Sequence, residues 1–125
     1  MSGERDPGAH VQDMVEACEH VIMFADGLSD EELLDSQRPV RGGVLHNLMI
    51  LGEASKHVPE QWVSRYPDIH WKRIAGMRDK IVHNYFGLNE DIVVLSVRTS
   101  VPAILPLLRA MLAEMDAEDQ AEPAP

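Results

Sequence analysis

Apolar residues recur at intervals of three and four positions in four long segments of this sequence, while the alternation typical of strands is nearly absent. The first stripe consists of Val11, Met14, Val15, Cys18, Val21, Ile22 and Ala25. Side chains with this spacing lie on one face of an α-helix and can be buried together. The pattern predicts an all-α chain, and 125 residues is the length of one domain.

Capping signals divide the first part of the chain into helices. Asp6-Pro7 is a cap followed by proline, which suits the first position of a helix, and this helix is expected to end near Gly27. Ser29 and Glu32 have the spacing of a capping box, in which each side chain bonds the backbone N–H of the other residue. A short second helix is therefore expected directly after Ser29.

The next long helix is expected to begin at Arg38-Pro39 and to be stopped by Pro59, with a short helix or turn over residues 59–66. Gly52 lies inside this helix, where glycine costs about 1 kcal/mol of helix stability relative to alanine. We expect Gly52 to mark the close approach of another helix.

A fourth long helix is expected over residues 69–85, with Gly87 in the place of its C-terminal cap. Asn89 is expected to cap a last helix, which Pro102 and Pro106 should kink or break in two. The architecture that fits these elements is an antiparallel bundle of four to five helices.

The formal net charge of −10 is unevenly distributed. Residues 1–37 carry ten acids and one arginine (−9), residues 38–80 carry eight basic residues and four acids (+4), and residues 81–125 carry seven acids and two arginines (−5). A basic middle could hold a phosphate while the acidic ends repel long duplexes, although solvated helix faces would give the same pattern. We assign residues 1–115 to one domain and residues 116–125 to an acidic, disordered tail.

No feature indicates secretion or a membrane. The one cysteine, Cys18, excludes a disulfide within the chain and fits the core face of the first helix. No apolar run follows an N-terminal basic stretch, and no segment approaches about 18 uninterrupted apolar residues. We therefore expect a cytoplasmic protein that does not contact a membrane.

The densest cluster of chemically active side chains lies within residues 76–87. Cleavage of RNA without a metal needs a base for the 2′-hydroxyl, a cation for the phosphate and a proton donor for the leaving 5′-oxygen. His83 can transfer protons near neutral pH, and Arg78 can contact a phosphate through two N–H groups. Asn84 and Tyr85 can donate hydrogen bonds. The cluster therefore predicts a site for RNA cleavage.

The spacing of Arg78 and His83 poses a geometric problem. Five residues turn an ideal α-helix by about 140°, so the two side chains diverge on a regular helix. Either the last turn before Gly87 unwinds, or a twofold dimer brings a second copy across the site, and we favour the dimer. Asp79 lies four residues before His83 on the same face, where it could orient the imidazole and favour its protonated form.

The same residues also have structural interpretations. Arg78 and His83 could form an interface network of ion pairs. Tyr85 and Phe86 could close the end of the helix as core aromatics, and we expect Phe86 in the core and Tyr85 within reach of solvent.

Glu53 has two possible roles, as a supporting polar group in the site or as a partner of Lys56 or His57 on its own helix. His46, Glu53 and His57 do not have the spacing of the zinc helix motif, in which two histidines lie four apart around a glutamate. We therefore expect no metal and no cofactor.

Arg78-x-x-x-x-His83-x-Tyr85 resembles the signature of HepT-like toxins within the HEPN superfamily. Three further blocks resemble the same family in the same order, residues 27–33 (GLSDEEL), residues 48–56 (LMILGEASK) and residues 66–78 (YPDIHWKRIAGMR). The resemblance covers nearly the whole chain except its two ends. The motif alone is a weak signal, whereas the motif with these flanking blocks is a specific one.

This resemblance implies an all-helical, HEPN-like homodimer that acts as a ribonuclease toxin on RNA, not DNA, with its site near the dimer interface. Its antitoxin would be a small nucleotidyltransferase that transfers AMP from ATP to the tyrosine of the motif, here Tyr85. The added charge beside Arg78 and His83 would block RNA phosphate from the pocket. Asn84 departs from the pattern, because many members carry an acid there, and activity would be weaker here if that acid helps proton transfer.

Two alternatives to catalysis remain open from the sequence. The pocket could hold a nucleotide or an RNA end without cutting it, as in non-catalytic members of the HEPN superfamily. The chain could instead be a structural partner that a nucleotidyltransferase modifies or holds.

Overall fold

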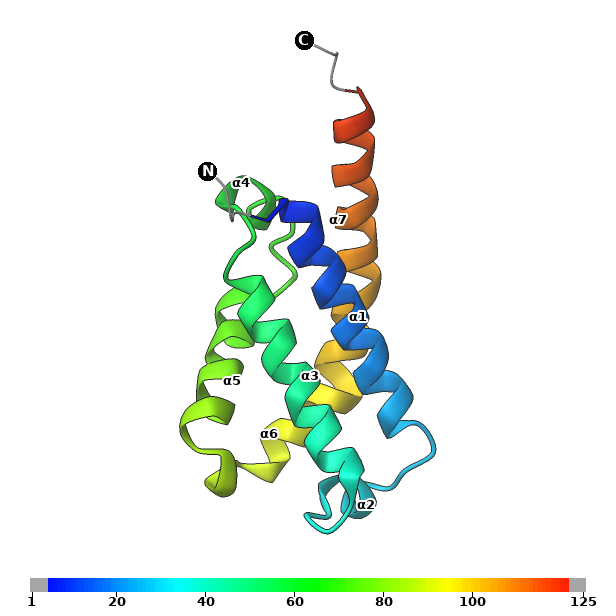
Figure 1. The fold of residues 1–125 in the computed structure, drawn as a ribbon, viewed down its shortest axis with the longest axis vertical. Helices are drawn as coiled ribbons and strands as arrows, with labels where there is room; N and C mark the ends of the chain where they lie inside the picture. The colour runs from blue at the N-terminus through cyan, green and yellow to red at the C-terminus, as the bar shows by residue number, and fades with distance from the viewer. Residues whose placement is uncertain (1–4, 122–125) are drawn as a thin grey trace.

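A computed structural model describes residues 5–121, and every regular element in this range is helical, which confirms the prediction of an all-α chain. The long elements are α1 (Pro7–Ala25), α3 (Pro39–Ser55), α5 (Trp71–His83) and one continuous helix made of α6 (Glu90–Leu95), a π-helical segment (Ser96–Ser100) and α7 (Val101–Ala121). The short elements are α2 (Asp30–Leu34), α4 (Glu60–Val63) and a 3-10 turn (Tyr85–Gly87). Successive long helices run in opposite directions in Figure 1, so the bundle is antiparallel.

Helix starts follow the predicted capping signals. The Asp6 carboxylate accepts from the backbone N–H of Gly8 at 3.3 Å, and Pro7 occupies the first helical position. Ser29 Oγ accepts from the N–H of Glu32 at 3.1 Å, while Glu32 Oε1 accepts from the N–H of Ser29 at 2.9 Å. The predicted capping box is therefore confirmed, and local chemistry decides where these helices begin.

The core forms where α3 packs between α1 and α5, and where α1 also packs against α7. The predicted stripe of α1 is buried except for Ile22, which is 36% exposed at its edge. Cys18 is fully buried within it, and burial raises the pKa of its thiol to about 12. Cys18 is therefore part of the core, as predicted, and stays protonated at neutral pH.

The last helix is longer and less interrupted than expected. It reaches Ala121, so the predicted disordered tail is wrong for residues 116–121, and residues 122–125 lie outside the described residues. An ion pair of 2.6 Å between Arg65 and Glu118 ties this end to the bundle. Pro102 and Pro106 do not break the helix. Just before Pro102 the π-helical segment shifts the backbone pairing, with the N–H of Val101 bonded to the carbonyl of Ser96 five residues back, and α7 continues through Pro106.

In the described residues, one helix is long and apolar enough to cross a membrane, the continuous helix of residues Glu90–Ala121, with a mean hydropathy of 1.6 in its most apolar window. Length and composition are the only basis for this match. One face of α7 is buried in the bundle, including Val101, Leu108 and Met111, so packing against α1 accounts for much of its apolar character.

Candidate active site

Gly52 allows α5 to lie directly against α3 at the position of Arg78. A Cβ atom added at Gly52 would overlap Cβ of Arg78 and come within 2.9 Å of the carbonyl oxygen of Ile74. Ile74 and Ile81 are buried on the same side of α5. The predicted close helix approach is therefore confirmed, and it fixes the stem of the motif arginine on the surface of α3.

Arg78 is held by two carboxylates, and its side chain is 28% exposed. Its Nε lies 3.3 Å from Glu53 Oε1 on α3, and its Nη1 donates to Asp79 Oδ1 at 3.1 Å. The guanidinium lines a cavity of about 380 Å³ between α1, α3 and α5, together with Glu53 and the histidines His10, His46 and His57. A phosphate that bound Arg78 would have to displace or share these carboxylates.

Glu53 makes contacts of both kinds that the sequence left open. It contacts Arg78 and also pairs with His57 Nε2, just beyond the end of α3, at 3.2 Å. Lys56, the other expected partner, instead donates to Asp79 at 2.7 Å. Glu53 is therefore a positioning group for the motif arginine in this structure.

Asp79 does not orient the histidine, which corrects the expectation drawn from their spacing. Its Oδ1 accepts from Lys56 at 2.7 Å and from Arg78 at 3.1 Å, and no hydrogen bond joins it to His83 in the described part of the chain. The hydrogen bond from Lys56, followed by that from Arg78, lowers the pKa of Asp79. Two permanent cations attract this carboxylate more strongly than an imidazole would.

His83 is the last residue of α5 and is exposed. Its imidazole has no hydrogen-bond or ion-pair partner among residues 5–121. The helix is regular up to His83, so the angle of about 140° between Arg78 and His83 applies to this structure. The chain leaves the helix only at Asn84, after His83, so the expected unwinding does not bring the two side chains together.

The turn after α5 differs from the predicted cap. Asn84 ends the helix with φ −145° and ψ 49°, and its Nδ2 donates to the carbonyl of Gly87 at 3.2 Å. Gly87 is not a left-handed cap, because positive φ occurs in the described residues only at Gly27. Gly87 is needed for space instead, since a Cβ there would lie 2.6 Å from Asn84 Oδ1.

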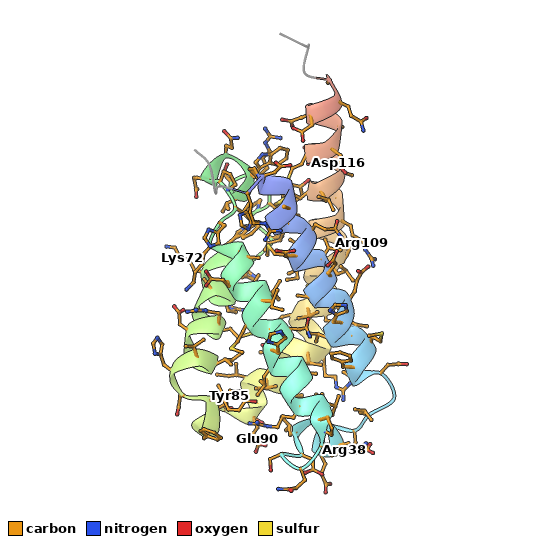
Figure 2. All side chains as sticks on the ribbon, viewed as in Figure 1. Arg38, Lys72, Tyr85, Glu90, Arg109 and Asp116 are labelled. Carbon is orange, nitrogen blue, oxygen red and sulfur yellow. The ribbon has the colours of Figure 1, made fainter. Side chains whose placement is uncertain are left out.

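Of the two aromatic residues of the turn, Tyr85 is within reach of solvent as predicted, whereas Phe86 is not in the core. Phe86 is 98% exposed, so its assignment to the core is wrong, whereas Tyr85 is half-buried and packs against the core. Figure 2 shows Tyr85 at the lower end of the bundle, where α5 ends. The guanidinium of Arg41, near the start of α3, lies 5.6 Å from the centre of the Tyr85 ring. Sequence analysis missed Arg41, because 44 residues separate it from Tyr85 and only the fold joins them.

A groove of about 730 Å³ separates α5 from the continuous last helix. Lys72, Arg73 and Lys80 line its α5 side, while the opposite wall is apolar or carries hydroxyl groups. These three side chains and Arg41 have no acidic partner among residues 5–121, unlike the other four basic residues of the segment 38–80. The free positive charge of the bundle is therefore concentrated along α5 and at its end.

No three His, Cys, Asp or Glu side chains gather as a metal site in the part of the chain that the structure describes. Of His46, Glu53 and His57, only His57 and Glu53 are joined by a hydrogen bond in the described residues. The site as built from its geometry therefore consists of a guanidinium held by carboxylates, a free imidazole and an aromatic turn.

Comparison with known proteins places this arrangement in a family. The family model described as "Ribonuclease HepT-like" matches residues 14–111. The chain belongs to the HepT-like ribonuclease family. The matched HepT-like region runs from the middle of α1 into α7 and contains all six predicted site residues, Glu53, Arg78, Asp79, His83, Asn84 and Tyr85.

Individual relatives of this HepT-like chain align over most of its length. A protein of Methanocaldococcus jannaschii named "Putative RNase MJ0127" is 30% identical over 94% of this chain and 96% of its own. A protein of Caldanaerobacter subterraneus named "Putative RNase TTE0752" is 31% identical over 86% and 96%. "Probable ribonuclease HepT" of Thermococcus cleftensis is 32% identical over 76% and 86%. No solved structure matches the chain.

Proposed function

We propose that this HepT-like protein is the toxin of a toxin–antitoxin pair, an endoribonuclease that cleaves RNA without a metal. The observation that carries the proposal is the family match over residues 14–111, which includes a partly exposed Arg78 and an exposed His83 that has no hydrogen-bond or ion-pair partner among residues 5–121. These two groups supply a cation and a proton-transfer group, which are the parts that attack by a 2′-hydroxyl requires.

The proposed reaction is an internal transfer of the phosphate ester. A base removes the proton of the 2′-hydroxyl, the 2′-oxygen forms a bond to phosphorus, and the bond from phosphorus to the 5′-oxygen breaks. The leaving 5′-oxygen takes up a proton, so the products carry a 2′,3′-cyclic phosphate and a 5′-hydroxyl. Arg78 offsets the charge that builds on the phosphate, and His83 performs one of the two proton transfers.

We further propose that the active species is a homodimer in which Arg78 of one copy and His83 of the other act on the same phosphate. The support is the divergence of these side chains by about 140° on a regular helix within one chain. A twofold axis beside the end of α5 could place Arg78 of each copy near His83 of the other, because in an isologous dimer residue i of one copy meets residue j of its partner and the reverse.

The proposed control of activity is transfer of AMP to Tyr85 by a partner nucleotidyltransferase. The phenol oxygen would bond to the α-phosphorus of ATP, pyrophosphate would leave, and the phenol proton would pass to solvent. Tyr85 is partly accessible, and Arg41 lies over its ring, where a guanidinium would stabilise the added phosphodiester. The modified residue would then occupy the region where RNA phosphate has to bind.

The deciding experiment incubates the purified, unmodified protein with total RNA in EDTA, beside Arg78→Ala and His83→Ala. His70→Ala and Arg109→Ala are matched controls, because both side chains are exposed and lie outside the motif, and neither belongs to the free cations along α5. We expect cleavage by the parent and both controls, with 2′,3′-cyclic phosphate ends, and at least a 100-fold loss in both motif variants. Mass spectrometry must first establish that Tyr85 carries no AMP.

A non-catalytic module that binds RNA or a nucleotide is the second candidate. The observation that favours it is the pairing of Arg78 with both Glu53 and Asp79, so that the guanidinium of the motif arginine is already occupied by carboxylates. RNA binding by the unmodified parent without any cleavage would support this second function and reject the first.

A further inference from the structure

Phe86 is the most exposed large apolar side chain among residues 5–121. Its side chain is 98% exposed, whereas the other large exposed apolar residues lie between 36% and 60%. The turn that carries it is held by two hydrogen bonds, Gly87 N–H to Asn84 O at 3.1 Å and Asn84 Nδ2 to Gly87 O at 3.2 Å. A fixed turn therefore presents a whole aromatic ring to solvent, three residues after His83.

The ring of Phe86 has one aromatic neighbour, Tyr85, among residues 5–121. The ring of Tyr85 meets it edge to face, with centres 5.3 Å apart and planes inclined by 76°. Arg41 lies over the ring of Tyr85 at 5.6 Å. The end of α5 thus carries a row of one guanidinium and two rings, from Arg41, Tyr85 and Phe86. Proteins use aromatic rings and arginine side chains of this kind to stack unpaired bases.

The charge around this row suits a polyanion. Lys80 lies one helical turn before His83 on α5 and lines the cavity of about 340 Å³ next to Asn84, Gly87 and Asn89. Neither Lys80 nor Arg41 has an acidic partner in the described residues. A strand with its base on Phe86 would therefore find free cations for its phosphates on the same end of the bundle.

We propose that Phe86 binds an unpaired nucleobase beside the scissile phosphate, so that the substrate class is single-stranded RNA. This proposal rests on the proposed ribonuclease function and adds the feature of RNA that the site selects. Bases inside a duplex are already stacked on their neighbours, so only a single strand, loop or end can place a base on an exposed ring. Stacking on the exposed ring would therefore favour RNA with unpaired bases over duplex RNA.

The test measures binding separately from cleavage. The probe is a fluorescein-labelled 2′-O-methyl oligoadenylate of twelve residues, which cannot be cut because it has no 2′-hydroxyl, and anisotropy is followed in EDTA. We expect Phe86→Ala and Phe86→Leu to raise Kd about 5- to 100-fold, because loss of one stacked base has an effect of this size. Phe86→Trp keeps an aromatic face, so it should bind like the parent and show quenched indole fluorescence on binding.

Two controls fix the interpretation. Met23→Ala removes a 60% exposed apolar side chain from α1, at a distance from the motif in sequence, and should leave Kd unchanged. A 2′-O-methyl duplex should bind the parent and Phe86→Ala equally, because it offers no free base. Phe86 is exposed, so its removal does not disturb the core.

Four results would overturn the proposal. Three of them concern binding of the single strand: no binding by the parent, equal Kd values for the parent and Phe86→Ala, and parent-like binding by Phe86→Leu. The fourth is a change from dimer to monomer in Phe86→Ala, which would assign the ring to an interface between copies. The outcome is separable from that of the proposed function. If the parent binds the probe through Phe86 but cleaves no RNA, only the proposed ribonuclease function is refuted. If the parent cleaves RNA but Kd is the same for the parent and all Phe86 variants, only this inference is refuted.

Discussion

Arg78 shows how strongly single residues decide the state of this site. Its guanidinium is paired with Glu53 and Asp79, but all three side chains are partly exposed. Ion pairs in such positions contribute only about 0–1 kcal/mol, because water and salt screen them. A phosphate that offers two charge-assisted hydrogen bonds can therefore displace them. The resting ion pairs keep the arginine in place without blocking its use.

Gly52→Ala should disturb both the fold and the site. The new methyl group would overlap Cβ of Arg78 and press on the Ile74 carbonyl, so α5 would have to move away from α3. We expect the free energy of unfolding to fall by about 1–3 kcal/mol, measured by urea denaturation. Any RNA cleavage should fall with it, because Arg78 moves.

Gly42→Ala is the matched control for Gly52→Ala. Gly42 lies in the same helix, with nothing within 4 Å of its added Cβ. We expect a gain of about 0.5–1 kcal/mol in stability, because alanine favours the helix. Equal effects of the two substitutions would contradict the close packing of α3 and α5.

The last helix shows how an element tolerates residues that should break it. Pro106 lies inside α7, and the π-helical segment Ser96–Ser100 lies just before this helix. A proline cannot donate a backbone hydrogen bond and collides with the carbonyl four residues earlier. The helix continues because one face of α7 is buried against α1, and this packing offsets the local cost.

Pro106→Ala should therefore stabilise the protein. Restoring one backbone donor and removing the clash is expected to raise the free energy of unfolding by about 1–3 kcal/mol, observed as a higher Tm by circular dichroism. Pro39→Ala is the control, because Pro39 occupies the first position of α3, where a missing N–H has no cost. A lower Tm for Pro106→Ala would contradict this account.

Tyr66 links the segment before α5 to α7 through a hydrogen bond from its hydroxyl to Glu114. Burial, followed by this bond to a carboxylate, raises the pKa of Tyr66 from 10.0 to about 12. A raised pKa means that the folded state holds the phenol proton more tightly than the unfolded state does. Its contribution to stability is complete below pH 10 and is lost as the pH rises toward about 12.

Tyr66→Phe should consequently be less stable than the parent at pH 8, with a difference that shrinks between pH 10 and 12. Urea denaturation of both proteins across this range measures the difference directly, and effects of other titrating groups cancel in the comparison. A difference that stays constant from pH 8 to 12 would show that Tyr66 is not coupled to folding in this way.

On the scale of the whole molecule, the antiparallel bundle concentrates free basic groups although the protein is acidic. Lys72, Arg73 and Lys80 line the groove beside α5, and Arg41 reaches the end of the same helix. Ion pairs neutralise the other four basic residues of segment 38–80, so its free positive charge is confined to a band formed by these four side chains. Such a band attracts a single polyanionic strand, while the acidic remainder repels larger nucleic acids.

The proposed dimer makes a prediction that no single chain can meet. Arg78→Ala and His83→Ala chains carrying different tags are co-expressed, and the mixed dimer is isolated through both tags. If each site combines Arg78 of one copy with His83 of the other, the mixed dimer has one intact site and about half of the parent activity. Activity as low as in either pure variant would mean that both residues act within one chain or that cleavage has another source.

The sequence determined the helices of this protein, because the signals that start a helix are local. Asp6, Ser29 and Asn89 cap their helices with side chains two or three residues from the bonds that they make. Periodic apolar residues indicated the core. Gly52 indicated a close contact between two helices, because a Cβ atom at this position would leave no room for Arg78. The motif from Arg78 to Tyr85, together with the three flanking blocks, likewise indicated the family, because these residues and their order are visible without a fold.

The tertiary structure decided what the side chains do at the end of α5. Asp79 accepts a hydrogen bond from Lys56, Arg41 lies over the ring of Tyr85, and Phe86 is exposed. Spacing along one helix did not predict these environments, because they depend on packing and charge between segments that are distant in the sequence. The path of the last helix through Pro106 had the same cause, since burial against α1 offset a local penalty. Short-range hydrogen bonds and apolar periodicity can be predicted from the sequence, whereas contacts between distant segments form only when the chain folds.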